Sequence, residues 1–430
     1  MQDSQPGPAD LATGHVTGLP ATDVVVVGGG IAGGALAVQL ARGGVRVTVL
    51  EQSRQFRDRV RGEYMPPWGY LELVRADLLD VVMRAEGRVT RHLVPYGDAM
   101  SPDLAQARAT DAAGLVPGAP GMLNLSHPDA CRELLDEAAE HGARVVRGVH
   151  GVRVEAGRRP RVSFVRDNRE HRVQAGLLVG ADGRGSVVRR QLGVTWSTTG
   201  ARTSIAGVLV DGVSGWADEV NATGTCEDVT YFLFPRQSGC ARVYLAFDRN
   251  SPGRFTGAGA GGRMVQRMRS LPCFPDSSAF AHARARPGWA SFPLEDTWSE
   301  RPGVPGAVLI GDAAGYSDPF LGQGLSVAVR DARLVADALL GSAPWDDRLF
   351  DAYATERAER MRRLRATADA MTRLLGDYTP AGRRRRIAAF DRFAVDPSLR
   401  LPLAAELVGP DALPAEAFTR AAADRMLSPA

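Results

Sequence analysis

The feature that most constrains this chain is a run of four valines that ends in a cluster of glycines. Residues 24–27 are all valine, and Gly28-Gly29-Gly30-Ile31-Ala32-Gly33 follows them in a G-x-G-x-x-G pattern. Residues 31–42 are small and apolar, which indicates a helix, and residues 45–50 indicate a second buried strand that Glu51 ends. The order strand, helix, strand predicts a βαβ unit whose two strands are parallel.

Each part of this unit suits a dinucleotide. Gly28 permits a tight turn, Gly30 lets the backbone approach a pyrophosphate, and Gly33 allows the helix to pack closely on the strand. The helix N-terminus carries partial positive charge that favours phosphate, and the Glu51 carboxylate can accept hydrogen bonds from ribose hydroxyls. The pattern does not by itself distinguish NAD from FAD. We expect dinucleotide contacts at Gly28, Gly30, Ile31, Ala32, Gly33, Glu51 and Gln52.

Two further strand-and-turn motifs lie far downstream. Residues 177–189 indicate a short buried strand, an Asp182-Gly183 turn and the start of a helix. Residues 308–325 indicate another buried strand that ends at Gly311-Asp312, followed by a glycine-containing segment from which the next helix begins. Turns of these compositions are common, so only their combination with the G-x-G-x-x-G pattern is specific.

In this order, the three motifs resemble those of the para-hydroxybenzoate hydroxylase-like flavoproteins, the single-component class A monooxygenases. The resemblance covers most of residues 22–345 and implies that the dinucleotide is non-covalently bound FAD. It also implies that Asp312 binds ribityl hydroxyls and that the helix N-terminus after Pro319 stabilises the anionic reduced flavin. The contacts that it implies in the second and third motifs are Asp182, Gly311, Asp312, Pro319, Gly322, Gln323, Gly324 and Leu325.

Two more cofactor contacts follow from the same resemblance, each with a structural alternative. Arg61 matches an arginine that approaches the FAD phosphates or adenosine, and its alternative is a surface side chain. His127 falls where the family usually has Arg or Gln near the ribityl chain, and its alternative is a structural histidine. The sequence also departs from the family at Gly315, where His is frequent, and at Gln52, where Arg is common.

We expect an α/β fold: a Rossmann-like FAD-binding domain with an inserted, mainly antiparallel β-sheet substrate domain and a C-terminal helical region. The FAD-binding domain is predicted to be discontinuous, over residues 22–86, 120–197 and 290–345. Within it, residues 68–86 are expected to be helical. The remaining parts are a disordered lead over residues 1–21, the substrate domain over 87–119 and 198–289, and the helical region over 346–430.

Composition narrows the class of function. All 52 basic residues are arginine, which GC-rich coding bias explains, and the formal net charge is only +3, so we expect no nucleic-acid partner.

The uncharged run over residues 24–41 is as long as a membrane span, but its clustered glycines favour strand, turn and helix. The N-terminus lacks the pattern of a signal peptide. The four cysteines form no C-x-x-C pair, so we expect reduced thiols, no bound metal and a cytoplasmic protein.

The resemblance implies an NAD(P)H-consuming monooxygenase that hydroxylates or epoxidises a small organic substrate through a C4a-hydroperoxyflavin, with O2 as cosubstrate. The GC-rich coding bias suggests bacterial secondary metabolism and an aromatic or polyketide-type substrate. A single G-x-G-x-x-G argues against the disulfide reductases, which bind two dinucleotides. Tyr231, Phe232, Phe234 and Pro235 are candidates to line the substrate pocket, with a plain core strand as their alternative.

Three other functions are alternatives to a monooxygenase. A flavin-dependent halogenase needs a lysine to carry the halogen, and this chain contains none. A flavin-dependent reductase of isoprenoid double bonds is compatible with the Gly-Asp-Ala-Ala-Gly segment and would work without O2. A flavin-binding protein without turnover is the third. The sequence does not decide between NADH and NADPH, identify a catalytic acid or base, or give the oligomeric state.

Overall fold

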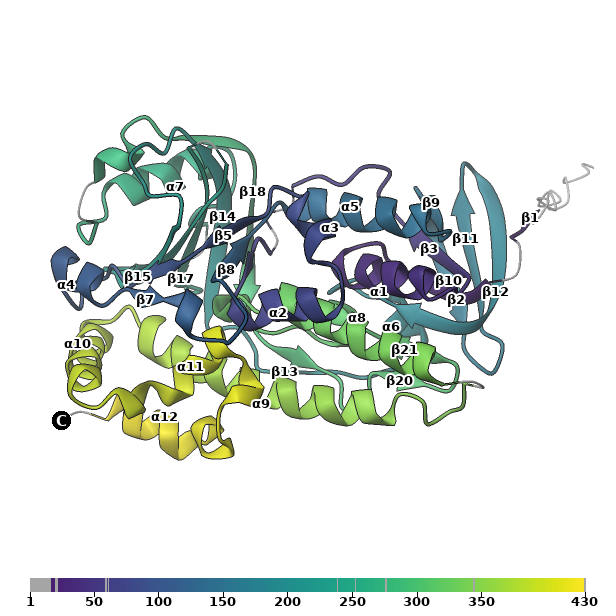
Figure 1. The fold of residues 1–430 in the computed structure, drawn as a ribbon. Helices are drawn as coiled ribbons and strands as arrows, with labels where there is room; N and C mark the ends of the chain where they lie inside the picture. The colour runs from purple at the N-terminus through teal and green to yellow at the C-terminus, as the bar shows by residue number, and fades with distance from the viewer. Residues whose placement is uncertain are drawn as a thin grey trace, which may run out of the picture.

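The computed structural model describes residues 17–19, 22–58, 60, 62–237, 239–251, 253–274, 277–342 and 345–428. Two large sheets lie toward opposite ends of an elongated molecule, with helices between and beneath them (Figure 1). Among the described residues one sheet contains nine strands and the other contains seven. The predicted α/β fold with a second, mainly antiparallel sheet and C-terminal helices is confirmed.

The nine-stranded sheet has a parallel centre and an antiparallel edge. Its main path runs through β10 (His150–Glu155), β11 (Arg161–Arg166), β12 (Arg169–Gly180), β2 (Thr22–Val27), β3 (Val47–Glu51) and β9 (Arg144–Arg147). The long strand β12 also pairs with β1 (Thr17–Gly18) and β21 (Ala307–Leu309), and β21 pairs with β20 (Gly303–Val304). The βαβ unit lies at the centre of this sheet.

The βαβ prediction is confirmed in detail. β2 and β3 are parallel, with Val24 opposite Val47 and Val27 opposite Leu50. Helix α1 (Ile31–Arg42) connects them and packs against α5 (His127–Glu140) and α8 (Gly324–Gly341). The valines of β2 and the apolar residues of β3 are buried because apolar clusters cover both faces of the sheet.

The register of three parallel strands brings the three sequence motifs to one edge. At the end of β12, Gly180 lies opposite Val27 of β2 on one side and Leu309 of β21 on the other. A motif turn follows each of these strands directly. Because carboxyl ends of parallel strands meet at one edge of a sheet, turns far apart in sequence become neighbours there.

The seven-stranded sheet is antiparallel except where β6 joins β15. Its strands in order are β18 (Arg284–Leu294), β14 (Thr203–Asp211), β17 (Cys240–Asp248), β16 (Val229–Pro235), β15 (Val220–Cys226), β6 (His92–Val94) and β7 (Thr110–Asp111). Helix α7 (Ala260–Arg269) packs on β14 and β18. Two small sheets pair β4 (Tyr64–Met65) and β5 (Arg88–Thr90) with β8 (Met122–Asn124), and β13 (Ser197–Thr198) with β19 (Thr297–Trp298).

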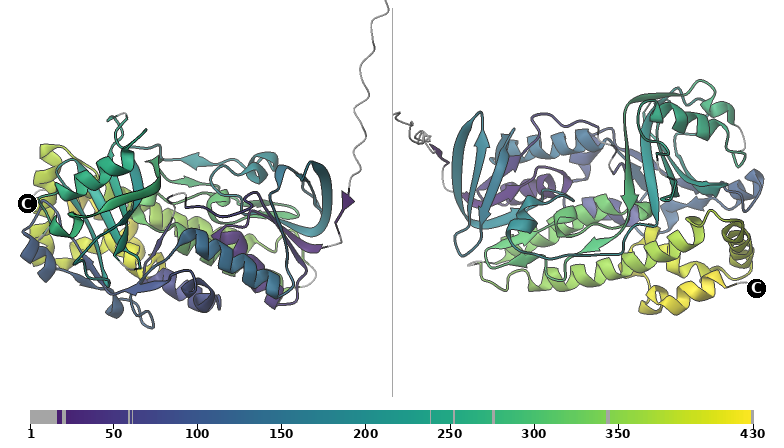
Figure 2. Two further views of the ribbon diagram at one scale, coloured as in Figure 1. Left: turned by 90° about the horizontal axis from the view of Figure 1, so that it is seen from above. Right: turned by 180° about the vertical axis from the view of Figure 1, so that it is seen from behind.

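The C-terminal helices connect the two sheets on one side of the molecule (Figure 2). Helix α9 runs from beside α8 to the seven-stranded sheet, where the hydroxyls of Thr225 and Thr230 donate to the Leu375 carbonyl at 2.8 and 2.9 Å. Helix α11 (Leu401–Val408) packs on α9 and on α2 (Pro67–Arg75) near that sheet. The helices of this region are α9 (Asp351–Leu375), α10 (Pro380–Val395), α11 (Leu401–Val408) and α12 (Arg420–Leu427).

Some expectations need adjustment. The helical segment expected over residues 68–86 is two helices, α2 (Pro67–Arg75) and α3 (Leu79–Met83), because Asp77 between them has a φ of 54° that a helix cannot contain. Of the lead predicted over residues 1–21, residues 17–19 are described and pair in part as β1, while the rest lies outside the described residues. The domain boundaries stay a prediction. No described helix is both long and apolar enough to span a bilayer.

Candidate active site

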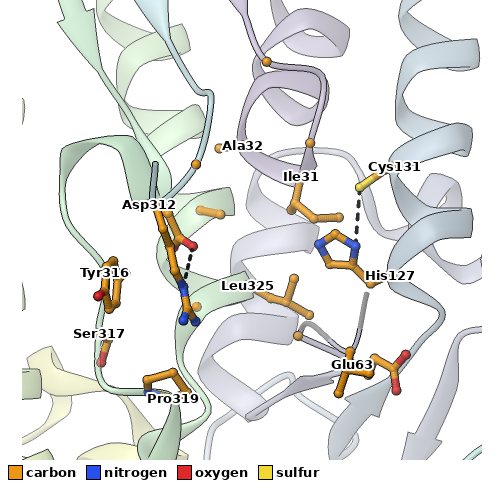
Figure 3. Close-up of a pocket in the computed structure, with 18 of the residues that line it drawn as sticks. Ile31, Ala32, Glu63, His127, Cys131, Asp312, Tyr316, Ser317, Pro319 and Leu325 are labelled. Carbon is orange, nitrogen blue, oxygen red and sulfur yellow. Dashed lines mark hydrogen bonds and ion pairs between the residues drawn. The ribbon is translucent and has the colours of Figure 1, made fainter. Parts of the chain in front are cut away.

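A cavity of about 1000 Å³ opens at the edge where the three motif turns meet. On the side of the nine-stranded sheet Gly30, Asp182 and Asp312 line it, and on the other side Phe232 and Phe234 of β16 do. Figure 3 shows the residues around the turns, with Asp312, Tyr316 and Pro319 on one wall and Ile31 and His127 on the facing wall. The cavity therefore joins the three motifs to the second sheet.

The G-x-G-x-x-G turn has the geometry of a phosphate cradle. Gly28 has a φ of 104°, and a Cβ there would lie 2.3 Å from the Ala181 carbonyl oxygen. A Cβ on Gly33 would lie 1.9 Å from the Gly28 carbonyl oxygen, so both glycines are required by the packing of the turn. Gly30 differs, because a Cβ there would meet no heavy atom within 4 Å and would project into the cavity. The space beside Gly30 fits a pyrophosphate at the N-terminus of α1, whose first turn carries no acidic residue.

Glu51 is held at the end of β3 by backbone groups. Its carboxylate accepts hydrogen bonds from the Gly29 N–H at 2.7 Å and the Ser53 N–H at 2.6 Å. A carboxylate can accept about four hydrogen bonds, so this one retains capacity for ribose hydroxyls. Glu51 and its neighbour Gln52 both line the cavity, as the prediction of ribose and adenine contacts requires.

The second motif provides a turn that its own aspartate stabilises. Asp182 lines the cavity, and its carboxylate caps α6 (Val187–Gln191) by accepting from the N–H groups of Val187 and Val188 at 2.6 and 3.1 Å and from the Ser186 hydroxyl. This cap explains the aspartate without a cofactor. A contact between Asp182 and the flavin remains a prediction.

A buried ion-pair network fixes the third motif. Asp331 of α8 is fully buried and accepts from the Gly311 N–H at 2.8 Å. Arg357 and Arg360 of α9 pair with the same carboxylate at 2.9 and 2.7 Å. Arg357 also donates to the Gly311 and Gly315 carbonyls at 3.1 and 2.7 Å. The network therefore holds the turn through the backbone of Gly311, which does not line the cavity. Sequence reasoning missed this network because three separate segments contribute to it.

Asp312 points into the cavity beside an arginine that the sequence analysis did not select. Its Oδ2 lies 3.5 Å from Nε of Arg184, an interaction marked in Figure 3. The Arg184 guanidinium lies between the rings of Phe292 and Tyr316, 5.0 and 4.6 Å from their centroids. The signal for Arg184 was its position directly after the Asp182-Gly183 turn. This pair gives the centre of the cavity both a hydrogen-bond acceptor and a cation.

The segment before α8 presents backbone to the cavity. Gly322 has a left-handed φ of 72°, and a Cβ on Gly324 would meet no heavy atom within 4 Å. Pro319, Gly322, Gly324 and Leu325 line the cavity as predicted, and the first turn of α8 contains no acidic residue. Gln323 does not line the cavity, and a contact between it and FAD remains a prediction. Its side chain is fully buried, accepts from Trp68 Nε1 at 2.7 Å and donates to the Leu321 carbonyl at 2.7 Å, so it supports the segment from behind.

The two predictions that carried structural alternatives have different outcomes. His127, the first residue of α5, lines the cavity, and its Nδ1 lies 3.8 Å from Sγ of Cys131 (Figure 3). Its position beside Ile31 and Leu325 is compatible with a contact to the ribityl chain. Arg61 lies outside the described residues. A role for either residue in binding FAD remains a prediction.

The wall formed by the second sheet is aromatic. Phe232 and Phe234 line the cavity, Phe234 stacks on Tyr64 with ring centroids 4.9 Å apart, and Phe232 meets the edge of Phe320 at 5.4 Å. The other two candidates of this strand, Tyr231 and Pro235, do not line the cavity. Side chains alternate between the faces of a strand, so these two residues of β16 point the other way. There the Tyr231 hydroxyl, fully buried, donates to the Tyr96 carbonyl at 2.7 Å.

Two acidic side chains that the sequence analysis did not select also line the cavity. Glu63 is buried and pairs with Arg242 and, at 3.2 Å, with Arg236. Glu406 of α11 accepts a hydrogen bond from the Tyr64 hydroxyl at 2.8 Å. Desolvation raises the pKa of Glu406 to about 7, against the opposing effect of the Tyr64 hydrogen bond. The cavity therefore has a carboxyl group that titrates near neutral pH.

Comparison with known proteins identifies the class of this fold. Residues 21–368 match the family described as FAD binding domain. The chain belongs to this family. The resemblance to para-hydroxybenzoate hydroxylase-like flavoproteins and the assignment of FAD as cofactor are thereby confirmed, and so, at the level of the family, is the enzyme class of FAD-dependent monooxygenases.

Individual relatives are distant. Squalene epoxidase 2, mitochondrial, of Arabidopsis thaliana is 27% identical over 330 residues, which are 74% of this chain and 54% of that protein. The match covers between about half and two thirds of the length of these squalene epoxidases. The uncharacterized aromatic compound monooxygenase YhjG of Bacillus subtilis is 27% identical over 376 residues, 84% of this chain and 70% of that protein. The structure of Pseudomonas aeruginosa PqsL with 2-aminobenzoylacetate matches with a TM-score of 0.70 and 25% identity, covering 86% of this chain and all of PqsL.

Proposed function

We propose that this chain is an FAD-dependent, NAD(P)H-consuming monooxygenase that inserts one atom of O2 into a small organic molecule. The observation that carries the proposal is the single cavity that three dinucleotide-binding turns border on one side and an aromatic wall borders on the other. When bound, FAD transfers two electrons from NAD(P)H to O2. The protein's part is to hold the cofactor, exclude water and orient the substrate.

Different residues of the cavity bind different parts of FAD. The N-terminus of α1 beside Gly30 binds the diphosphate, and Glu51 accepts hydrogen bonds from the ribose. Asp312 binds the ribityl hydroxyls, and the Arg184 guanidinium, 3.5 Å away, holds its carboxylate in place. The N-terminus of α8, which Gly324 leaves uncovered, stabilises negative charge on the flavin ring.

The aromatic wall points to an apolar substrate. One apolar cluster lines the cavity with Phe232, Phe234 and Tyr244 of the second sheet and with Met371 and Leu375 of α9. Such a wall keeps water from the reacting atoms and holds a flat apolar molecule. Aromatic substrates, including polyketide-type metabolites of bacterial secondary metabolism, fit this lining. The similarity to YhjG, named as an uncharacterized aromatic compound monooxygenase, supports an aromatic substrate, and the similarity to squalene epoxidases supports an alkene.

Turnover of the purified protein tests the proposal. Protein carrying stoichiometric FAD is mixed with NADH or NADPH and candidate phenols in 18O2, and products are measured by mass spectrometry. The expected result is substrate-stimulated NAD(P)H oxidation and a product that contains one 18O atom. A protein that does not retain FAD would contradict the proposal, and so would a product formed equally well without O2, which is the behaviour of a double-bond reductase.

A further inference from the structure

Glu406 is an acidic side chain in the cavity that no dinucleotide-binding motif explains. It lies on α11 in the C-terminal helical region, beyond the end of the FAD binding domain match at residue 368. It lines the cavity next to the apolar cluster that contains Phe232, Phe234 and its own neighbour Leu407. A carboxyl group placed at an apolar wall costs free energy unless hydrogen bonds or an opposite charge compensate it.

Contacts connect Glu406 to the substrate side of the cavity. Its Oε1 accepts from the Tyr64 hydroxyl at 2.8 Å, and the Tyr64 ring stacks on Phe234. The Glu406 backbone carbonyl lies 3.2 Å from Nε2 of Gln323, directly before α8. A Cβ on Gly322 would lie 3.1 Å from the Tyr64 ring. Glu406 therefore sits where the aromatic wall meets the segment that precedes α8.

Among the described acidic residues that line the cavity, Glu406 alone has a carboxylate with neither a described ion pair nor a described backbone N–H donor. Glu63 pairs with two arginines, and Asp312 pairs with Arg184. Asp182 caps a helix, and Glu51 accepts two backbone N–H groups. Glu406 makes one described hydrogen bond, from Tyr64, and no described ion pair, although its carboxylate can accept about four hydrogen bonds. A ligand in this part of the cavity gains most by bringing a hydrogen-bond donor.

We propose that Glu406 sets the substrate class by accepting a hydrogen bond from a phenolic hydroxyl, so that the enzyme prefers phenols to the corresponding ethers and hydrocarbons. This inference rests on the proposed function and makes it more specific. An aryl ring occupies the apolar wall, and its hydroxyl reaches Oε2 of Glu406. Burial raises the pKa of the Glu406 carboxyl in the free enzyme. Burial also strengthens the hydrogen bond that the ionised carboxylate forms with a donor.

Two probes of nearly equal shape test the inference. 2-Naphthol and 2-methoxynaphthalene share the same rings, but only 2-naphthol donates a hydrogen bond. Their Kd values for the FAD-loaded protein are measured at pH 8 from the change in flavin absorbance. We expect the wild type to bind 2-naphthol about tenfold more tightly than the ether, the effect of one hydrogen bond to a charged group. In Glu406→Gln the preference should fall to about twofold or less.

The variants separate recognition from a structural role. Gln has nearly the same shape and still accepts from Tyr64, so Glu406→Gln should retain FAD and unfold at a thermal midpoint no lower than that of the wild type. Glu416→Gln, at an exposed glutamate of the same region, should keep the full preference. A preference that persists in Glu406→Gln overturns the role of Glu406, as does a wild type that binds both probes equally. Loss of FAD from the wild type would instead contradict the proposed function itself.

Discussion

The glycines of the first motif allow a sharp test, because two of them face opposite surroundings. Gly30 has an ordinary extended backbone, with φ of −72° and ψ of −166°, and a Cβ there would project into the open cavity. A Cβ on Gly33 would overlap the Gly28 carbonyl oxygen, at 1.9 Å. Gly30→Ala should therefore damage the cofactor site alone, and Gly33→Ala should damage the fold.

The expected magnitudes follow from these contacts. In Gly30→Ala the methyl group occupies the space of the diphosphate, which loses at least one charge-assisted hydrogen bond of about 1.5–3 kcal/mol. The Kd for FAD should rise about 10-fold to 150-fold, while the free energy of unfolding of the apoprotein changes by about 1 kcal/mol or less. In Gly33→Ala the backbone must move, which should lower the free energy of unfolding by about 1–3 kcal/mol.

Two measurements on each variant give the answer. FAD is titrated into apoprotein and followed by quenching of flavin fluorescence, and the apoprotein is unfolded in urea. Wild-type affinity for FAD in Gly30→Ala would refute the assignment of the diphosphate to this turn. Wild-type stability in Gly33→Ala would refute the packing argument.

Three further predictions concern buried and cavity charges. Asp331→Asn should lower the free energy of unfolding by about 3–5 kcal/mol in urea titration, since it leaves the buried Arg357 guanidinium without its anion and Arg360 with Glu356 alone; a loss below 1 kcal/mol would contradict this. Arg184→Met, which keeps a similar apolar volume but removes the cation beside Asp312, should weaken FAD binding with little effect on apoprotein stability, measured by the same two titrations. The raised pKa of Glu406, about 7, predicts that wild-type stability falls relative to Glu406→Gln as pH rises from about 4.5 to 7, because the folded state holds a proton that the unfolded state has lost; parallel urea stabilities at pH 5 and pH 8 would contradict it.

The sequence by itself determined the dinucleotide fold and the backbone of the cofactor site. The valine run, the three glycine-and-aspartate turns and the small apolar helix are local patterns, and local patterns dictate strands, turns and helix N-termini. The turn and the strand end that the sequence predicts are therefore formed by Gly28, Gly30, Gly33 and Glu51. Their order along the chain also indicated FAD, because the combination is far more specific than any one of the three motifs.

Only the tertiary structure decided which side chains face the cavity. Phe232 and Tyr231 look equivalent in sequence, but the pleat of β16 sends one into the cavity and the other into the core. Gln323 lies within the last motif in sequence, but its side chain accepts a hydrogen bond from Trp68 of a distant helix. Glu406 carries no motif and lies on a helix about 80 residues beyond the last motif. Contacts between segments far apart in sequence depend on packing, which no local pattern encodes.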